Sequence, residues 1–208
     1  IYLLGRMFFI DGMIGVMTFG GVYASGTFNW DTTALLIFGL VTSSSAMIGA
    51  YVGGKLDDRL GSIRTLQIAI AMSSLVLITL VSIQPDTILF FIHVGTAPVW
   101  NSPYFASAPE LFYFATNQVF AMFFVTGLSS SRTLMARISP PAMITQFFGL
   151  FALSGTVTAF LAPLLVATVT TMFQSQRAGF ASLVLLMLVG SALLLKVREE
   201  QSSVAPGH

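Results

Sequence analysis

The chain has 208 residues, of which 55% are hydrophobic and only 8% are charged, and its mean hydropathy is +0.87. Because soluble domains carry about 25% charged residues, this composition excludes a soluble enzyme, a nucleic-acid module and a disordered tail. The net charge of +1 is too small to attract a polyanion, so no nucleic-acid partner is expected. The composition is that of an integral membrane protein.

Metal and cofactor sites are not expected either. The chain has no cysteine, and its two histidines, His93 and His208, are too far apart to provide a metal-ligand spacing. The sequence contains no phosphate-cradling loop, catalytic triad or paired carboxylate in a cleft. We therefore do not expect an enzyme.

Six apolar runs are long enough to span a membrane, because about 20 residues at 1.5 Å per residue cross a hydrocarbon layer of about 30 Å. The predicted helices cover residues 1–25, 33–53, 65–83, 111–128, 146–173 and 179–195, followed by a tail over 196–208. The predicted fold is an all-α bundle of six transmembrane helices.

The first run contains two charged residues, and an intramembrane charge costs about 2.5–3.5 kcal/mol, which makes each a functional candidate. Asp11 lies about 15 Å into the span and is followed by Gly12, so we expect it to contact a solute or carry a coupling proton. The alternative is a hydrogen bond to a neighbouring helix. Arg6 is a second candidate, unless its side chain extends to the interface. The two are about 140° apart around the helix, which predicts that they do not share a face.

The second run has Gly49 and Gly53 at a GxxxG spacing, which allows close helix contact either within one bundle or between two chains. The stretch 54–64 is predicted as a short loop, in which Gly61 permits a tight reversal. Its two adjacent acids, Asp57 and Asp58, are suited to bind a helix N-terminus or an arginine.

Residues 84–109 separate the third and fourth runs. The apolar stretch in this segment is too short to span, and its β-branched and aromatic residues predict a short extended segment or hairpin over 87–94 at the membrane surface. Nearby Trp100, Tyr104 and Tyr113 are typical of the interfacial aromatic belt.

Two later runs contain polar or helix-breaking residues. Asn117 and Gln118 in the fourth run could bond a solute in a cavity or tie two helices together. In the fifth run Pro163 predicts a kink, assisted by Gly155, and hence a hinge for gating.

Basic residues divide between the two sides of the predicted bundle. The three connections on one side hold only Arg177. The other side holds Lys55, Arg59, Arg64, Arg132, Arg137, Lys196 and Arg198. The positive-inside rule makes the second side cytoplasmic, so both ends of the chain are expected to face the cytoplasm.

The loop over 54–64 resembles the signature between the second and third helices of each half of major facilitator superfamily transporters. Four positions match, namely Gly54, Asp58, Arg59 and Gly61. The usual basic residues that follow are replaced by Ser62 and Ile63, with Arg64 one place late. The resemblance implies that Asp58 and Arg59 latch the two halves of a transporter together in one state and release them in the other.

Other stretches resemble the branch of that superfamily related to the autophagy-associated vacuolar amino-acid effluxer. They are residues 131–140 and 146–151, and Arg6-Met7, Asp11-Gly12, Phe19–Gly21 and Tyr23-Ala24 in the first run. This resemblance implies the second six-helix half of a twelve-helix secondary transporter for a small solute, in a bacterial inner membrane, with an N-terminal six-helix half as its partner. The implied cytoplasmic gate comprises Gly54, Asp57, Asp58, Arg59, Gly61, Arg64, Arg132 and Arg137.

Three positions depart from that branch. It usually has glutamate, lysine and glycine where this chain has Gln146, Thr156 and Ala162, and the first two changes remove charges suited to coupling. Three hypotheses therefore stay open, namely a transporter half, a non-transporting membrane scaffold with a transporter-like fold, and a half-transporter that homodimerises. Because the apolar run begins at Ile1, we expect the chain to be cut from a longer protein.

Overall fold

Six apolar segments long enough to cross a membrane form the computed structural model, which describes residues 1–197. The elements are α1 (Tyr2–Phe28), α2 (Thr32–Leu60), α3 (Ser62–Ser82), β1 (Thr87–Ile88), β2 (Ile92–His93), α4 (Ala108–Ile138), the 3-10 turn η1 (Pro141–Met143), α5 (Ile144–Thr156), α6 (Leu161–Phe173) and α7 (Gln176–Leu194). The predicted six-helix bundle is confirmed, with η1, α5 and α6 together forming the fifth span. Arg198 and the rest of the predicted tail lie outside the described residues.

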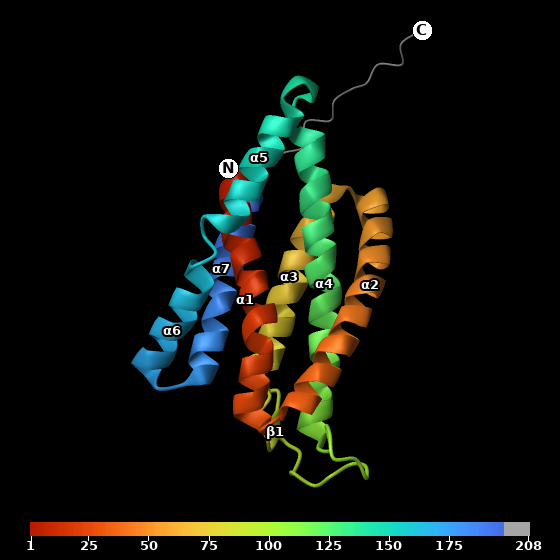
Figure 1. The fold of residues 1–208 in the computed structure, drawn as a ribbon, viewed down its shortest axis with the longest axis vertical. Helices are drawn as coiled ribbons and strands as arrows, with labels where there is room; N and C mark the ends of the chain where they lie inside the picture. The colour runs from red at the N-terminus through yellow and green to blue at the C-terminus, as the bar shows by residue number, and fades with distance from the viewer. Residues whose placement is uncertain (198–208) are drawn as a thin grey trace.

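The helices pack side by side with their long axes roughly aligned (Figure 1). The α1 helix packs against α7, and α4 packs against both α2 and α3, while α6 lies against α7. The N-terminus, the α2–α3 turn and the α4–α5 turn lie at one end, which carries most of the basic residues and which we call the basic end. The β1–β2 hairpin and the α6–α7 turn lie at the other end, which we call the hairpin end.

The α2–α3 connection is much shorter than predicted. The α2 helix continues to Leu60, so most of the predicted loop is helical and only Gly61 separates the two helices. No proline lies between residues 54 and 60 to end the helix earlier. Gly61 has φ of 84°, a conformation that glycine adopts without strain, and its N–H donates to the Asp57 carbonyl at 2.9 Å.

The α4 helix is also longer than predicted, so Arg132 and Arg137 lie on its last turns rather than in a loop. It begins at a capping box formed by Ser107 and Glu110 and ends before Ser139, whose extended backbone is what a following proline requires. Its 31 residues extend about 46 Å, so its ends pass beyond the hydrocarbon layer.

The GxxxG pair of α2 packs within the bundle. Carbon atoms added at Gly49 and Gly53 would collide with Met122 and Thr126 of α4. The Thr126 hydroxyl also donates to the Gly49 carbonyl at 3.0 Å. Because α4 occupies this face, the alternative of a contact between two chains is not supported.

The predicted hairpin over 87–94 is confirmed. Strands β1 and β2 pair antiparallel, with Thr87 opposite His93. Trp100 is exposed as expected of a belt residue, but the same prediction for Tyr113 is wrong. Tyr113 is fully buried because it faces α1, where its hydroxyl donates to the Gly20 carbonyl at 2.8 Å.

Candidate functional site

The fifth span is interrupted near its middle. The α5 helix ends at Thr156 and α6 begins at Leu161, with turns over residues 157–160. Pro163 lies in the first turn of α6, where its ring would clash with the carbonyl of Ala159 if the helix were continuous. The structure therefore shows the α-helix interrupted by turns ahead of Pro163, which is a larger disturbance than the predicted kink.

Asp11 binds the first turn of the second half of this span. One of its carboxylate oxygens accepts a hydrogen bond from the Ala162 backbone N–H at 3.0 Å, and its side chain is buried. This N–H has no intrahelical acceptor, because a helix leaves its first four N–H groups unpaired. A carboxylate is also favoured at this end by the positive pole of the helix dipole.

Arg6 binds the last turns of the first half. Its Nη1 donates to the Phe151 carbonyl at 2.9 Å and to the Ser154 hydroxyl at 2.7 Å, and the guanidinium lies 3.6 Å from the centroid of the Phe151 ring. Arg6 is only 7% exposed, so its guanidinium is enclosed by the bundle and does not extend into solvent. Among the described residues, no carboxylate lies within 4.0 Å of it, and its Nε has no partner.

Two opposite charges on α1 therefore compensate the two helix ends at the break. The cation meets the carbonyl end of α5 and the anion meets the N–H end of α6, which is the arrangement that the helix dipoles favour. Arg6 and Asp11 contact different halves of the fifth span, so the prediction that they do not share a face of their helix is not contradicted.

Small and hydroxyl residues complete the contact between α1 and the break. A Cβ atom at Gly155 would lie 3.1 Å from Arg6 Nη1, so glycine leaves room for the guanidinium. The Thr158 hydroxyl donates to the Met7 carbonyl at 3.3 Å. Ser154 and Thr158 were not predicted, because isolated hydroxyl residues in an apolar run carry no strong functional signal.

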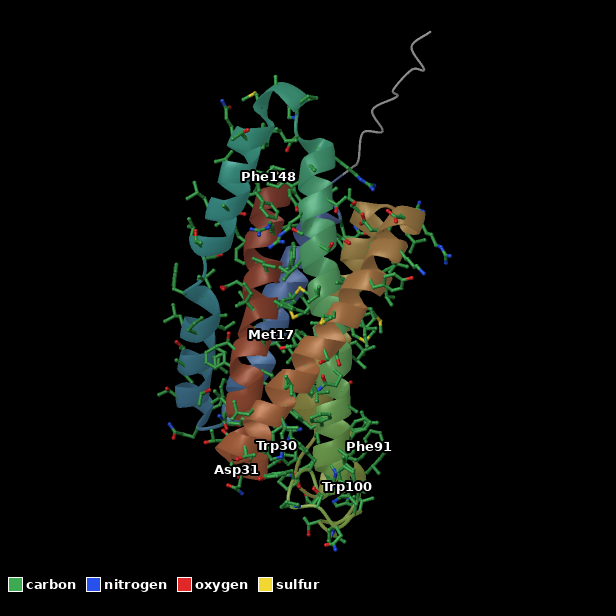
Figure 2. The ribbon with its side chains drawn as sticks, turned by 45° about the vertical axis from the view of Figure 1, so that its right-hand side comes forward. Met17, Trp30, Asp31, Phe91, Trp100 and Phe148 are labelled. Carbon is green, nitrogen blue, oxygen red and sulfur yellow. The ribbon has the colours of Figure 1, made fainter. Side chains whose placement is uncertain are left out.

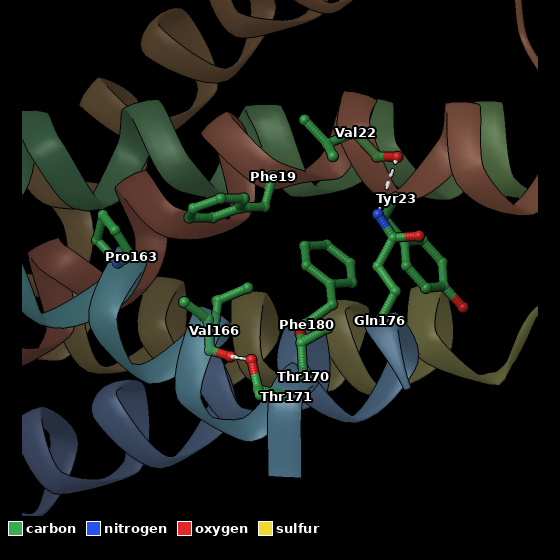
Figure 3. Close-up of a pocket in the computed structure, with 10 residues that line it drawn as sticks. Phe19, Val22, Tyr23, Pro163, Val166, Thr170, Thr171, Gln176 and Phe180 are labelled. Atoms are coloured by element: carbon green, nitrogen blue, oxygen red, sulfur yellow. Dashed lines mark hydrogen bonds between the residues drawn. The ribbon is translucent and has the colours of Figure 1, made fainter. Parts of the chain in front are cut away.

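A pocket of about 290 Å³ adjoins the break toward the hairpin end. It lies between α1, α6 and α7 and is lined largely by apolar side chains, with Phe19 and Pro163 at one end (Figure 3). At the other end Gln176 donates to the Val22 carbonyl at 3.3 Å. The sequence offered no signal for this pocket, because its lining residues come from three separated helices.

At the basic end, the structure brings together two of the predicted gate residues. Asp57 is buried, accepts a hydrogen bond from the Ser62 hydroxyl at 3.0 Å and lies 3.6 Å from Arg137 Nη2. This ion pair joins the end of α2 to the end of α4. It is the only ion pair within residues 1–197.

The remaining predicted gate residues are not brought into this contact. Gly61 forms the turn, and Gly54 has open space around it. The other charged gate residues, Asp58, Arg59, Arg64 and Arg132, are exposed.

Asn117 and Gln118 both reach the same hydroxyl on α2. The Asn117 amide donates to Thr42 Oγ1 at 3.2 Å, and the Gln118 amide approaches that oxygen at 3.5 Å. The Gln118 Oε1 atom is buried without a partner among the described residues. This geometry favours the alternative in which the two amides tie α4 to α2.

The chain was compared with protein families and with individual known proteins. The family model described as "Vacuole effluxer Atg22 like" matches residues 1–206. The chain belongs to this family. Membership in the Atg22-like family agrees with the superfamily resemblance of the α2–α3 turn.

Similar proteins come from fungi and bacteria. Autophagy-related protein 22 of Cryptococcus neoformans var. neoformans serotype D (strain JEC21) is 23% identical over 201 residues, which cover 97% of this chain and 34% of that protein. The uncharacterized MFS-type transporter YxiO of Bacillus subtilis (strain 168) is 24% identical over 207 residues, which cover 98% of this chain and 42% of that protein. The chain thus spans less than half the length of these relatives, and no solved structure matches it.

Proposed function

We propose that the chain is the C-terminal six-helix half of a secondary active transporter that moves a small solute, an amino acid or a related metabolite, by alternating access. The observation that carries this proposal is the interrupted fifth span, whose two helix ends are compensated by opposite charges on α1. Discontinuous helices in transporters place helix ends and free backbone groups near the middle of the bilayer, where solutes and coupling ions bind.

In this proposal α6 is the part that moves and Asp11 controls it. A hydrogen bond to a carboxylate is stronger than one to a neutral group, so protonation of Asp11 weakens its hold on the Ala162 N–H. The pocket between α1 and α6 leaves space into which α6 shifts. Arg6 keeps α5 in place. Gly155 and Pro163 lie on either side of the hinge at residues 157–160.

The proposed gate is at the basic end. The Asp57–Arg137 ion pair holds α2 to α4, while Asp58 and Arg59 are exposed and available to an N-terminal six-helix half. The asymmetry of basic residues supports a cytoplasmic basic end, and the proposed location is a bacterial inner membrane.

The experiment uses the full-length protein that contains this chain, reconstituted in liposomes. Solute counterflow with a mixture of labelled amino acids tests transport, and accumulation driven by a pH gradient tests proton coupling. We expect the wild type to do both, and Asp11→Asn to retain counterflow but lose gradient-driven accumulation.

The matched control is Asp31→Asn, because Asp31 also caps a helix N-terminus but lies exposed at the start of α2. This variant should keep both activities. Absence of counterflow with every amino acid, or gradient-driven accumulation by Asp11→Asn at the wild-type level, would overturn the proposal.

A further inference from the structure

The segment between α3 and α4 at the hairpin end has an unusual composition. Residues 87–107 contain no Asp, Glu, Lys or Arg. A water-exposed loop of this length ordinarily carries charge, since the ionic side chains are the ones found mostly at solvent-exposed positions. The segment is too short and too irregular to span the bilayer.

Large apolar side chains are exposed along this segment. Five of them are between 43% and 74% exposed. We call them the hairpin patch, which consists of Phe90, Phe91, Ile92, Val99 and Trp100. Figure 2 shows Phe91 and Trp100 at the edge of the hairpin end, near the start of α4. Contiguous exposed apolar residues mark a surface that contacts another molecule or a membrane.

Several backbone groups of the segment are paired internally. The hairpin ladder joins β1 to β2, the Val94 N–H donates to the Asp86 carbonyl at 2.9 Å, and the Val99 N–H donates to the Ala106 carbonyl at 2.8 Å. The Trp100 indole N–H donates to the Phe105 carbonyl at 2.8 Å. Internal pairing lowers the cost of moving these polar groups into a region with little water.

The segment that carries the patch is also attached to the bundle. Phe105 packs edge-on against Trp30 with ring centroids 4.8 Å apart, and Phe105 also contacts Phe114 of α4 at 4.7 Å. Trp30 in turn donates to Glu110 at the start of α4. An aromatic cluster that includes residues of α1, α2 and α4 therefore holds the end of this segment against the bundle.

The bilayer is the occupant that the geometry favours. The α3 helix ends at Ser82 and α4 begins at Ala108, so the segment starts and finishes where two spans leave the same face of the membrane. Tryptophan and other aromatic residues partition to that boundary. Beside the patch, the Arg177 guanidinium lies 4.9 Å from the Phe90 ring centroid, which suits a cation at headgroup level.

We propose that the hairpin patch inserts into the headgroup–acyl boundary of the leaflet at the hairpin end and so fixes the depth of α3 and α4 in the bilayer. This role is independent of the proposed transport cycle. It depends on the apolar side chains of the patch and not on the identity of any solute.

Spin-label accessibility in the full-length protein tests the proposal. Residues 1–208 contain no cysteine, so only cysteines outside them need to be replaced before a single one is introduced. A nitroxide at Phe91→Cys is compared with one at Asp86→Cys, which is exposed beside the hairpin but outside the patch. The protein is placed in vesicles of equal parts phosphatidylcholine and phosphatidylglycerol.

We expect the label at residue 91 to collide severalfold more with oxygen, which concentrates in the bilayer, than with a water-soluble nickel complex. The label at residue 86 should show the reverse. A residue 91 label that favours the nickel complex would place the patch in water and overturn the proposal. Protection from both reagents would place it against protein and would equally overturn it.

A second variant separates insertion from folding. Phe91→Glu, in a chain labelled at Val99→Cys, should lower the oxygen collision rate at residue 99 severalfold, whereas Phe91→Leu should leave it unchanged. Because Phe91 is 74% exposed, both variants should melt at the wild-type temperature in detergent. An unchanged oxygen collision rate at residue 99 in Phe91→Glu would contradict the proposal.

Discussion

The break in the fifth span and the basic end stabilise their charges in different ways. At the break, Arg6 and Asp11 are buried and are compensated by backbone and hydroxyl groups of two helix ends. At the basic end, Asp57 and Arg137 pair with each other, and the Arg137 side chain is 44% exposed. The stabilisation of a charge by a helix end depends on where that helix lies. When a partly exposed ion pair separates, water can hydrate the charges, so little stability is lost.

This difference suggests that the break is the more sensitive of the two regions. A shift of α6 changes the environment of Asp11 at once, because its hydrogen bond is to the backbone of that helix. If α2 and α4 move apart at the basic end, water can hydrate the separated charges of the ion pair. Four sets of variants test this comparison.

The largest effect is expected at Arg6. Hydrogen bonds to a charged group contribute about 1.5–3 kcal/mol each, and Arg6 makes two, so Arg6→Ala should lower the free energy of unfolding by about 3 kcal/mol. Denaturant unfolding in detergent measures it. Arg64→Ala, at an exposed position of the basic end, should change stability by less than about 0.5 kcal/mol. Equal effects of the two variants would contradict the comparison.

A smaller effect is expected at Asp11. Asp11→Ala leaves the buried Ala162 N–H unpaired and should cost about 2 kcal/mol, whereas Asp11→Asn keeps an acceptor and should cost about 1 kcal/mol. The same unfolding assay separates them. If both variants were as stable as the wild type, Asp11 would not hold the end of α6.

Two glycines of α5 give a matched pair with a still smaller effect. Gly155→Ala places a Cβ 3.1 Å from the Arg6 guanidinium and should lower stability by about 1 kcal/mol. Gly149→Ala meets nothing within 4 Å and should be neutral or stabilising by up to about 1 kcal/mol, because alanine favours the helix. Thermal unfolding should therefore occur at a lower temperature in Gly155→Ala than in Gly149→Ala, and a stabilising Gly155→Ala would show that Arg6 is not confined there.

The smallest effect is expected for the ion pair at the basic end. A double-mutant cycle with Asp57→Asn and Arg137→Gln should give a coupling energy below about 1 kcal/mol, because Arg137 is partly exposed. Raising the salt concentration should reduce this coupling further, while leaving the cost of Arg6→Ala nearly unchanged. A coupling energy larger than the cost of Arg6→Ala would reverse the comparison.

Much of the fold could be predicted from the sequence, because hydropathy and turn chemistry act locally. The six spans, the hairpin over 87–94 and the turn at Gly61 were predicted and are present. The predicted C-terminal ends of α2 and α4 lie several residues before the observed ends. The prediction followed the drop in hydropathy, which marks where a helix leaves the lipid and not where it stops being helical. The actual ends are at Gly61 and before Pro140.

The candidate site was predicted only in part. Asp11 and Arg6 were identified because a charge inside an apolar run is costly, and Pro163 because it cannot continue a helix. Their partners were not predicted, since Asp11 and Ala162 are 151 residues apart and the N–H concerned is free only because the helix breaks.

The sequence by itself determined that the chain spans a membrane six times, since each crossing depends on the composition of one contiguous run. Tertiary structure alone decided that Asp57 is the buried acid of its adjacent pair and that Tyr113 belongs to the core. It also placed the two charges of α1 at the two ends of a broken helix. The physical reason is that compensation of a buried charge depends on the positions of distant backbone groups, which exist only once the helices have packed.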